Sequence, residues 1–145
     1  MRGIDALFLR IAVLYVIAGM ALGIFMALSE DHTMMPAHAH MNLLGWVSMA
    51  LYAAVYRIWP ETAQSPLARW HFWLANIGTL VGVVGIAGIM AGYPDRFGPV
   101  AGIGAIVALA SMLVFAAIVY ARVPIARSAE GSAKPLQHSP VGAAD

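Results

Sequence analysis

The chain has 145 residues, of which 61% are hydrophobic and only 10% are charged, and its mean hydropathy of +0.80 is far above that of a soluble domain of this size. It contains no cysteine, which excludes disulfides, thiolate metal sites and thiol redox chemistry. The net charge of +1, without a basic stripe, argues against a nucleic-acid partner. The lipid bilayer is the expected surrounding.

Four apolar segments are long enough to cross about 30 Å of hydrocarbon. They run at about residues 6–28, 37–59, 70–93 and 97–121. The connections between them are short and rich in polar residues and proline, so neighbouring segments should run antiparallel. The sequence therefore predicts an all-α fold, in which residues 1–123 form one integral membrane four-helix bundle.

The two ends of the chain are expected in the cytoplasm. Residues 124–145 are polar and small, and predict a disordered cytoplasmic tail. The first segment is too long for the apolar part of a signal peptide, and is expected to be a retained helix. Basic residues favour the cytoplasmic side of a bacterial inner membrane, and all but Arg96 fall on the side of the termini: Arg2, Arg10, Arg57, Arg69, Arg122, Arg127 and Lys134.

Pairs of glycines four residues apart occur in three of the predicted helices. Such pairs let helix backbones approach closely in lipid. They predict either tight packing within the chain or contacts in a homo-oligomer, and they are Gly19/Gly23, Gly78/Gly82, Gly88/Gly92 and Gly98/Gly102.

Residues 32–46, HTMMPAHAHMNLLGW, bring unusual polar side chains to the start of the second segment. By the charge argument, this stretch lies on the periplasmic side. Its histidines are His32, His38 and His40, and its methionines are Met34, Met35 and Met41. Imidazole can bind haem iron, with His or Met as a second axial ligand. Imidazole together with thioether can bind copper, especially Cu(I).

His38 and His40 should face different directions. Pro36 suits the first turn of a helix, and two residues correspond to roughly 200° around a helix axis. One of the two imidazoles can therefore face the bundle while the other faces outward or a partner.

The segment AHAHMNLLGWVSMALYAAVYRIWPE resembles the second transmembrane helix of the catalytic subunit of haem-copper oxidases, most closely the nitric oxide reductase and high-affinity oxidase branches. The residues that carry this resemblance are His40, Asn42, Leu43, Leu44, Trp46, Tyr52, Tyr56, Pro60 and Glu61. The resemblance implies that His40 is an axial ligand of a low-spin haem b on the periplasmic side. His38, Asn42 and Trp46 are then further candidates for contact with the cofactor.

The later helices that carry the remaining haem and copper ligands in that family have no counterpart here, so isolated oxygen or nitric oxide reduction is not expected. A second axial ligand would come from Met26, from Met90, or from His38 or His40 of another copy. His71 should lie roughly 25 Å away, near the cytoplasmic face. It is expected to anchor the interface or to bond backbone near Asn76, with a second haem there as the alternative.

Three functions remain open. The first is a haem b-binding membrane protein related to haem-copper oxidase subunit I, acting in electron transfer or haem or gas sensing as a homo-oligomer, with a respiratory-chain or cytochrome partner. The second is a copper- or metal-handling protein that uses His32, His38, His40 and the three nearby methionines. The third is a cofactor-free assembly or structural subunit.

Overall fold

The computed structural model describes residues 3–124, and this part of the chain is helical without any strand. Three helices are long and apolar enough to cross a membrane: α1 (Ile4–Ser29), α5 (Leu67–Met90) and α6 (Pro94–Arg122). The predicted all-α membrane class is therefore confirmed. Beyond residue 124, the predicted tail lies outside the described residues.

The second apolar segment is divided into three consecutive helices. These are α2 (Met35–His40), the π-helix η1 (Met41–Ser48) and α3 (Met49–Ile58), which follow one another without a gap. A π-helix has a wider turn than an α-helix, with hydrogen bonds between residues five apart. A side chain follows the same spacing, since Ser48 Oγ donates to the carbonyl oxygen of Leu43 at 3.0 Å. Because of this division, none of the three helices alone has the length of a span, and the fourth membrane crossing stays a prediction.

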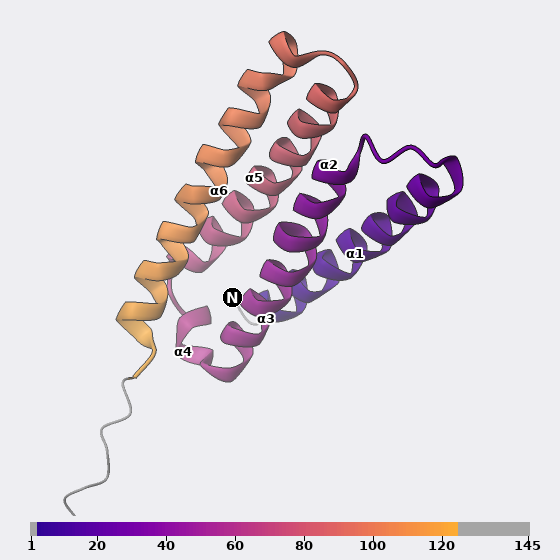
Figure 1. The fold of residues 1–145 in the computed structure, drawn as a ribbon. Helices are drawn as coiled ribbons and strands as arrows, with labels where there is room; N and C mark the ends of the chain where they lie inside the picture. Colours follow the sequence, from indigo (N-terminus) through magenta and orange to yellow (C-terminus); the bar gives the residue numbers. More distant parts are fainter. Residues whose placement is uncertain (1–2, 125–145) are drawn as a thin grey trace, which may run out of the picture.

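The helices run up and down between two ends of the molecule (Figure 1). We call the end with the α1–α2 and α5–α6 connections the loop end. The opposite end holds the start of α1, the short helix α4 (Pro60–Ala63) and the last turn of α6, and we call it the terminal end. The start of α2 lies at the loop end. Residues 32–41, which we call the His/Met stretch, therefore lie there as well.

Small residues allow α5 and α6 to pack backbone to backbone. A Cβ atom on Gly78 would lie 2.6 Å from the backbone nitrogen of Ala108, and one on Gly85 would lie 2.5 Å from the Cα of Ala101. Gly104 lies directly against the backbone of Gly82. The intrachain packing predicted for Gly78/Gly82 is therefore confirmed.

Two other glycine pairs behave differently. Nothing lies within 4 Å of a Cβ placed on Gly98 or Gly102, so packing within the chain is the wrong explanation for that pair. Gly104, two residues after Gly102, makes the contact with α5 instead. Gly92 has a φ of 94° and forms the turn after α5, a left-handed conformation that favours glycine.

The buried core lies at the terminal end and is aromatic. Phe8 of α1, Tyr52 and Tyr56 of α3 and Phe115 of α6 surround His71 of α5, with ring centroids 4.5–5.8 Å from the imidazole. Each of the four long segments contributes at least one ring. The aromatic core thus lies at the end opposite the His/Met stretch.

The sequence-based expectation for His71 was wrong. Its side chain is 0% exposed, so it does not anchor the membrane interface. Its Nδ1 shares a hydrogen bond of 2.9 Å with the Tyr56 hydroxyl, and not with backbone near Asn76. His71 Nε2 has no hydrogen-bond partner. The helix begins at Leu67, earlier than predicted, which places His71 inside the packed part of α5.

Candidate functional site

His38 lies on the face of α2 that packs against α1. Its Nδ1 is 3.0 Å from the carbonyl oxygen of Gly19, to which the Nδ1–H donates. A Cβ on Gly23 would lie 3.0 Å from His38 Cε1, and one on Gly19 would lie 2.5 Å from Asn42 Oδ1. The first glycine pair therefore makes room for two polar side chains of the facing segment, and not for a helix backbone.

Asn42 holds His38 in this position. Its side-chain amide donates to the backbone carbonyl of His38 at 3.0 Å, and the same nitrogen lies 3.3 Å from His38 Nε2. If Nδ1 carries the proton that bonds Gly19, Nε2 can accept from Asn42. Both ring nitrogens of His38 are then engaged inside the chain, which leaves none for a cofactor.

His40 faces a different direction, as the spacing predicted. Its side chain is exposed, and its Nδ1 donates to the carbonyl oxygen of Pro36 at 2.8 Å. No hydrogen bond to Nε2 is present among the described residues. Histidines that bind metals commonly donate their second ring N–H to a carbonyl, which fixes the tautomer and leaves the other nitrogen free to bind. His40 has this arrangement.

The His40 side chain lines a groove of about 460 Å³ between its own helix, α5 and α6. That volume is in the range of ligand pockets, roughly 300–1,000 Å³. Few large side chains fill the groove, because α5 and α6 present mainly small residues to it. Its lining consists of Gly78, Thr79, Gly82, Val83, Ile86, Ala101, Gly102, Gly104, Ala105 and Ala108, with Leu44 beside His40. Its lining holds neither methionine nor a second histidine. We call it the His40 groove.

The remaining predicted site residues are spread over different surfaces. His32 is exposed in the loop, with Nδ1 3.3 Å from the carbonyl oxygen of Glu30. Met41 lines a separate crevice beside α1, and Trp46 packs against the aromatic core. Asn42 thus contacts His38, and neither Asn42 nor Trp46 lines the His40 groove.

The side chains of the predicted copper site come from the loop before α2, from α2 itself and from the first residue of η1. Within residues 3–124, no three histidine, cysteine or acidic side chains are grouped so that they could hold a metal ion. Met34 is half-buried and Met35 is 53% exposed at the start of α2. The two methionines proposed as second axial ligands, Met26 and Met90, do not line the His40 groove. Copper binding by the His/Met stretch stays a prediction.

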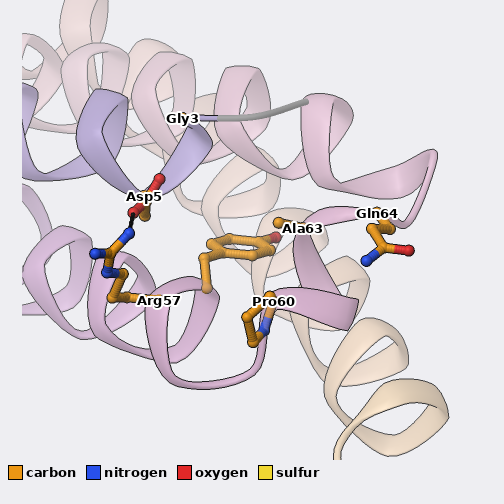
Figure 2. A pocket seen from close by; sticks show the side chains of 7 residues that line it. Gly3, Asp5, Arg57, Pro60, Ala63 and Gln64 are labelled. Carbon is orange, nitrogen blue, oxygen red and sulfur yellow. Dashed lines mark ion pairs between the residues drawn. The ribbon is translucent and has the colours of Figure 1, made fainter.

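A further pocket of about 490 Å³ lies at the terminal end, near the start of α1 (Figure 2). Arg57 and Asp5 meet there, with Nη1 and Oδ2 3.6 Å apart. The Arg57 side chain is 82% exposed, so this ion pair contributes little to stability. In the loop at the other end, hydrogen bonds from the hydroxyl and backbone N–H of Thr33 hold the pKa of Asp31 below its usual range.

The π-helix and the His40 groove were not predicted from the sequence. The π-helix begins directly after His40 and carries Asn42, and π-turns are frequent at functional sites. The groove did leave a signal, because Gly78/Gly82 lines it. That pair was interpreted only as a helix contact, within the chain or in a homo-oligomer, although small residues that bring two helices together also leave a shallow surface beside them.

Comparison with known proteins supports a partial resemblance to haem-copper oxidase subunit I. A stretch of 60 residues is 37% identical to a cytochrome c oxidase subunit 1 homolog of Agrobacterium tumefaciens (strain T37), covering 36% of this chain and 11% of that protein. A stretch of 63 residues is 35% identical to cytochrome c oxidase subunit 1 of Rhodobacter capsulatus, covering 38% of this chain and 12% of that protein. Part of the chain resembles cytochrome c oxidase subunit 1.

The predicted relation to haem-copper oxidase subunit I is confirmed in this partial form. The chain spans only about an eighth of the length of these two relatives. No family model matches the chain, and no solved structure matches it. The activity of a complete cytochrome c oxidase subunit 1 therefore does not transfer with the resemblance.

Proposed function

We propose that the chain is a haem b-binding membrane protein whose iron ligand is His40. The observation that carries this proposal is the state of the His40 side chain. Its Nδ1 is committed to the carbonyl oxygen of Pro36 at 2.8 Å, while its other nitrogen is free beside the His40 groove. The resemblance to cytochrome c oxidase subunit 1 supports haem as the group that it binds.

His40 suits this role better than His38. The two histidines lie on different faces, and His38 is tied to Gly19 and Asn42. Only His40 adjoins a surface with room for a flat ligand, because α5 and α6 carry glycine and alanine there. Haem would supply an iron that carries an electron or binds a diatomic gas.

The membrane arrangement belongs to the same proposal. We propose four spans, formed by α1, the continuous segment α2–η1–α3, α5 and α6. Arg57, Arg69 and Arg122 lie at the terminal end, and Arg96 lies at the loop end. By the positive-inside tendency, the terminal end faces the cytoplasm of a bacterial inner membrane and His40 lies towards the periplasm.

The second axial position decides between electron transfer and sensing. The His40 groove offers no second histidine or methionine from the described residues. A second ligand from another copy or from a respiratory partner would give a six-coordinate electron carrier. An open position would give a five-coordinate haem that binds gas. We favour electron transfer in a homo-oligomer, because the open glycines of α6 leave a flat face beside the groove.

The test uses two histidine variants of the protein purified with added haem. The wild type and His38→Ala should show a Soret band and sharp reduced α and β bands, and His40→Ala should lose them. Carbon monoxide added to the reduced protein should leave the bands unchanged if the iron is six-coordinate. Equal haem content in His40→Ala and the wild type would contradict the proposal. Loss of the bands in His38→Ala but not in His40→Ala would mean that His38 is the iron ligand, and this too would contradict the proposal.

A further inference from the structure

Two cavities meet at one ion pair at the terminal end. The first is the pocket of about 490 Å³ shown in Figure 2, which we call the terminal pocket. The second is a groove of about 350 Å³ between α1 and α3, which we call the α1–α3 groove. Asp5 and Arg57 line both cavities. A ligand with a polar part in the terminal pocket and an apolar part in the groove would therefore pass both charges.

The terminal pocket presents one positive and one negative charge side by side. Arg57 Nη1 lies 3.6 Å from Asp5 Oδ2, which is longer than the roughly 3.2 Å limit of an N–H···O hydrogen bond. The Arg57 side chain is 82% exposed and that of Asp5 is 25% exposed. The two groups therefore satisfy each other only in part, and both remain accessible to a ligand that carries the opposite charges.

The α1–α3 groove is apolar apart from this pair. Alanines on α3 leave it open, and the rest of its lining consists of Ala6, Leu9, Ala50, Ala53 and Ala54. The α1 helix is long and apolar enough to span a membrane. Leu9 is 49% exposed on this helix. The groove therefore faces the hydrocarbon of the bilayer and suits an acyl chain.

The two charges lie where a span meets the membrane surface. Asp5 is the second residue of α1, and Arg57 is the last residue but one of α3. The polar head groups of lipids occupy this level, on either side of about 30 Å of hydrocarbon. A lipid whose head group lies in the terminal pocket can therefore extend its acyl chain directly into the α1–α3 groove.

We propose that the terminal pocket and the α1–α3 groove together bind one molecule of phosphatidylethanolamine. The lipid phosphate accepts hydrogen bonds from Arg57, whose planar guanidinium suits phosphate. The primary ammonium of the head group donates to the carboxylate of Asp5. One acyl chain lies in the groove against the alanines of α3.

The pair of opposite charges selects this head group over other common ones. Phosphatidylglycerol would bring a phosphate to Arg57 but nothing positive to Asp5, and its negative charge would lie beside a carboxylate. Phosphatidylcholine carries both charges, but its quaternary ammonium has no N–H to donate. Inorganic phosphate would leave both the carboxylate and the apolar groove without a partner. Selection thus rests on repulsion of the wrong head group as well as attraction of the right one.

The test is native mass spectrometry of the purified full chain in detergent, titrated with the three lipids carrying identical acyl chains. Because the Arg57 side chain is largely exposed, an ion pair with it changes affinity by at most about fivefold. The wild type should therefore bind phosphatidylethanolamine about two- to fivefold more tightly than phosphatidylglycerol or phosphatidylcholine.

Three variants separate the parts of the site. Asp5→Asn keeps the size of the side chain but removes its charge, and should abolish the preference over phosphatidylglycerol. Arg57→Gln should weaken the binding of all three lipids, since each carries a phosphate. Ala54→Leu fills the groove, and should weaken binding of all three without changing their order.

Matched controls are Arg122→Gln and Asp95→Asn, exposed charges outside both cavities, which should bind as the wild type. Circular dichroism checks that each variant is folded. Equal affinity of the wild type for the three lipids would overturn the proposal. A preference that survives in both Asp5→Asn and Arg57→Gln, or that is lost equally in the controls, would also overturn it. Haem content does not enter any of these results.

Discussion

The hydrogen bond between Tyr56 and His71 predicts a measurable coupling in the stability of the bundle. The two side chains come from α3 and α5 and lie in the aromatic core, with the Tyr56 hydroxyl 2.9 Å from His71 Nδ1. His71 is 0% exposed and its Nε2 is already unpaired. Replacing Tyr56 by Phe removes the last hydrogen bond of a fully buried imidazole.

The magnitude follows from two limits. A buried polar group left unpaired costs about 1–3 kcal/mol. Hydrogen bonds between membrane helices show coupling of about 0.6 kcal/mol on average and up to about 1.7 kcal/mol. The Tyr56–His71 bond should lie in the upper part of that range, because burial leaves the pair no alternative partner. We expect Tyr56→Phe to lower the free energy of unfolding by about 1–2 kcal/mol.

The double variant separates the bond from the packing. His71→Phe leaves the Tyr56 hydroxyl without its hydrogen-bond partner, but it keeps the space inside the aromatic core filled with an apolar ring. It also removes the unpaired Nε2. Tyr56→Phe combined with His71→Phe leaves no polar atom to satisfy. The double variant should therefore be less destabilised than the sum of the two single variants, by about 1–1.5 kcal/mol.

The assay is reversible unfolding in mixed micelles, in which SDS is titrated and the loss of helix is followed by circular dichroism. Tyr120→Phe serves as the matched control, because Tyr120 is 90% exposed and should be neutral. Additive effects of Tyr56→Phe and His71→Phe would refute the reasoning. A neutral Tyr56→Phe would do the same, since it would mean that the hydroxyl does not stabilise the imidazole.

Two further predictions use the same unfolding assay. Gly85→Ala should lower the free energy of unfolding by about 1–3 kcal/mol, because the new methyl group would overlap the backbone of Ala101. Gly98→Ala should be neutral or slightly stabilising, since its Cβ meets nothing within 4 Å. Equal effects of the two variants would contradict the close packing of α5 on α6. Arg57→Ala should change stability by less than about 1 kcal/mol, because its ion pair with Asp5 is largely exposed, and a loss well above that would show that the pair is more shielded than its exposure indicates.

The sequence predicted the helices well where composition alone decides. Long apolar segments with polar connections located α1, α5 and α6 to within a few residues. The angular spacing of His38 and His40 predicted that they face different directions, and they do. These features depend on local geometry, which a single sequence contains.

Features that depend on which helices meet could not be predicted in the same way. The glycines Gly19/Gly23 signalled a close approach, but nothing in their spacing said that His38 and Asn42 would occupy the space. The π-helix leaves no distinct pattern, since a widened turn changes the helical period only over a few residues. His71 was misplaced because its partner, Tyr56, lies on another helix.

The central claim is that His40 binds haem b, and the absorption spectrum of the purified chain tests it most directly. The protein is produced with added haem, washed free of excess, and its haem content is compared with its protein content before and after reduction. The account predicts b-type bands in a fixed proportion to protein in the wild type and their absence in His40→Ala. A wild-type protein that folds, as judged by circular dichroism, and carries no haem would contradict it.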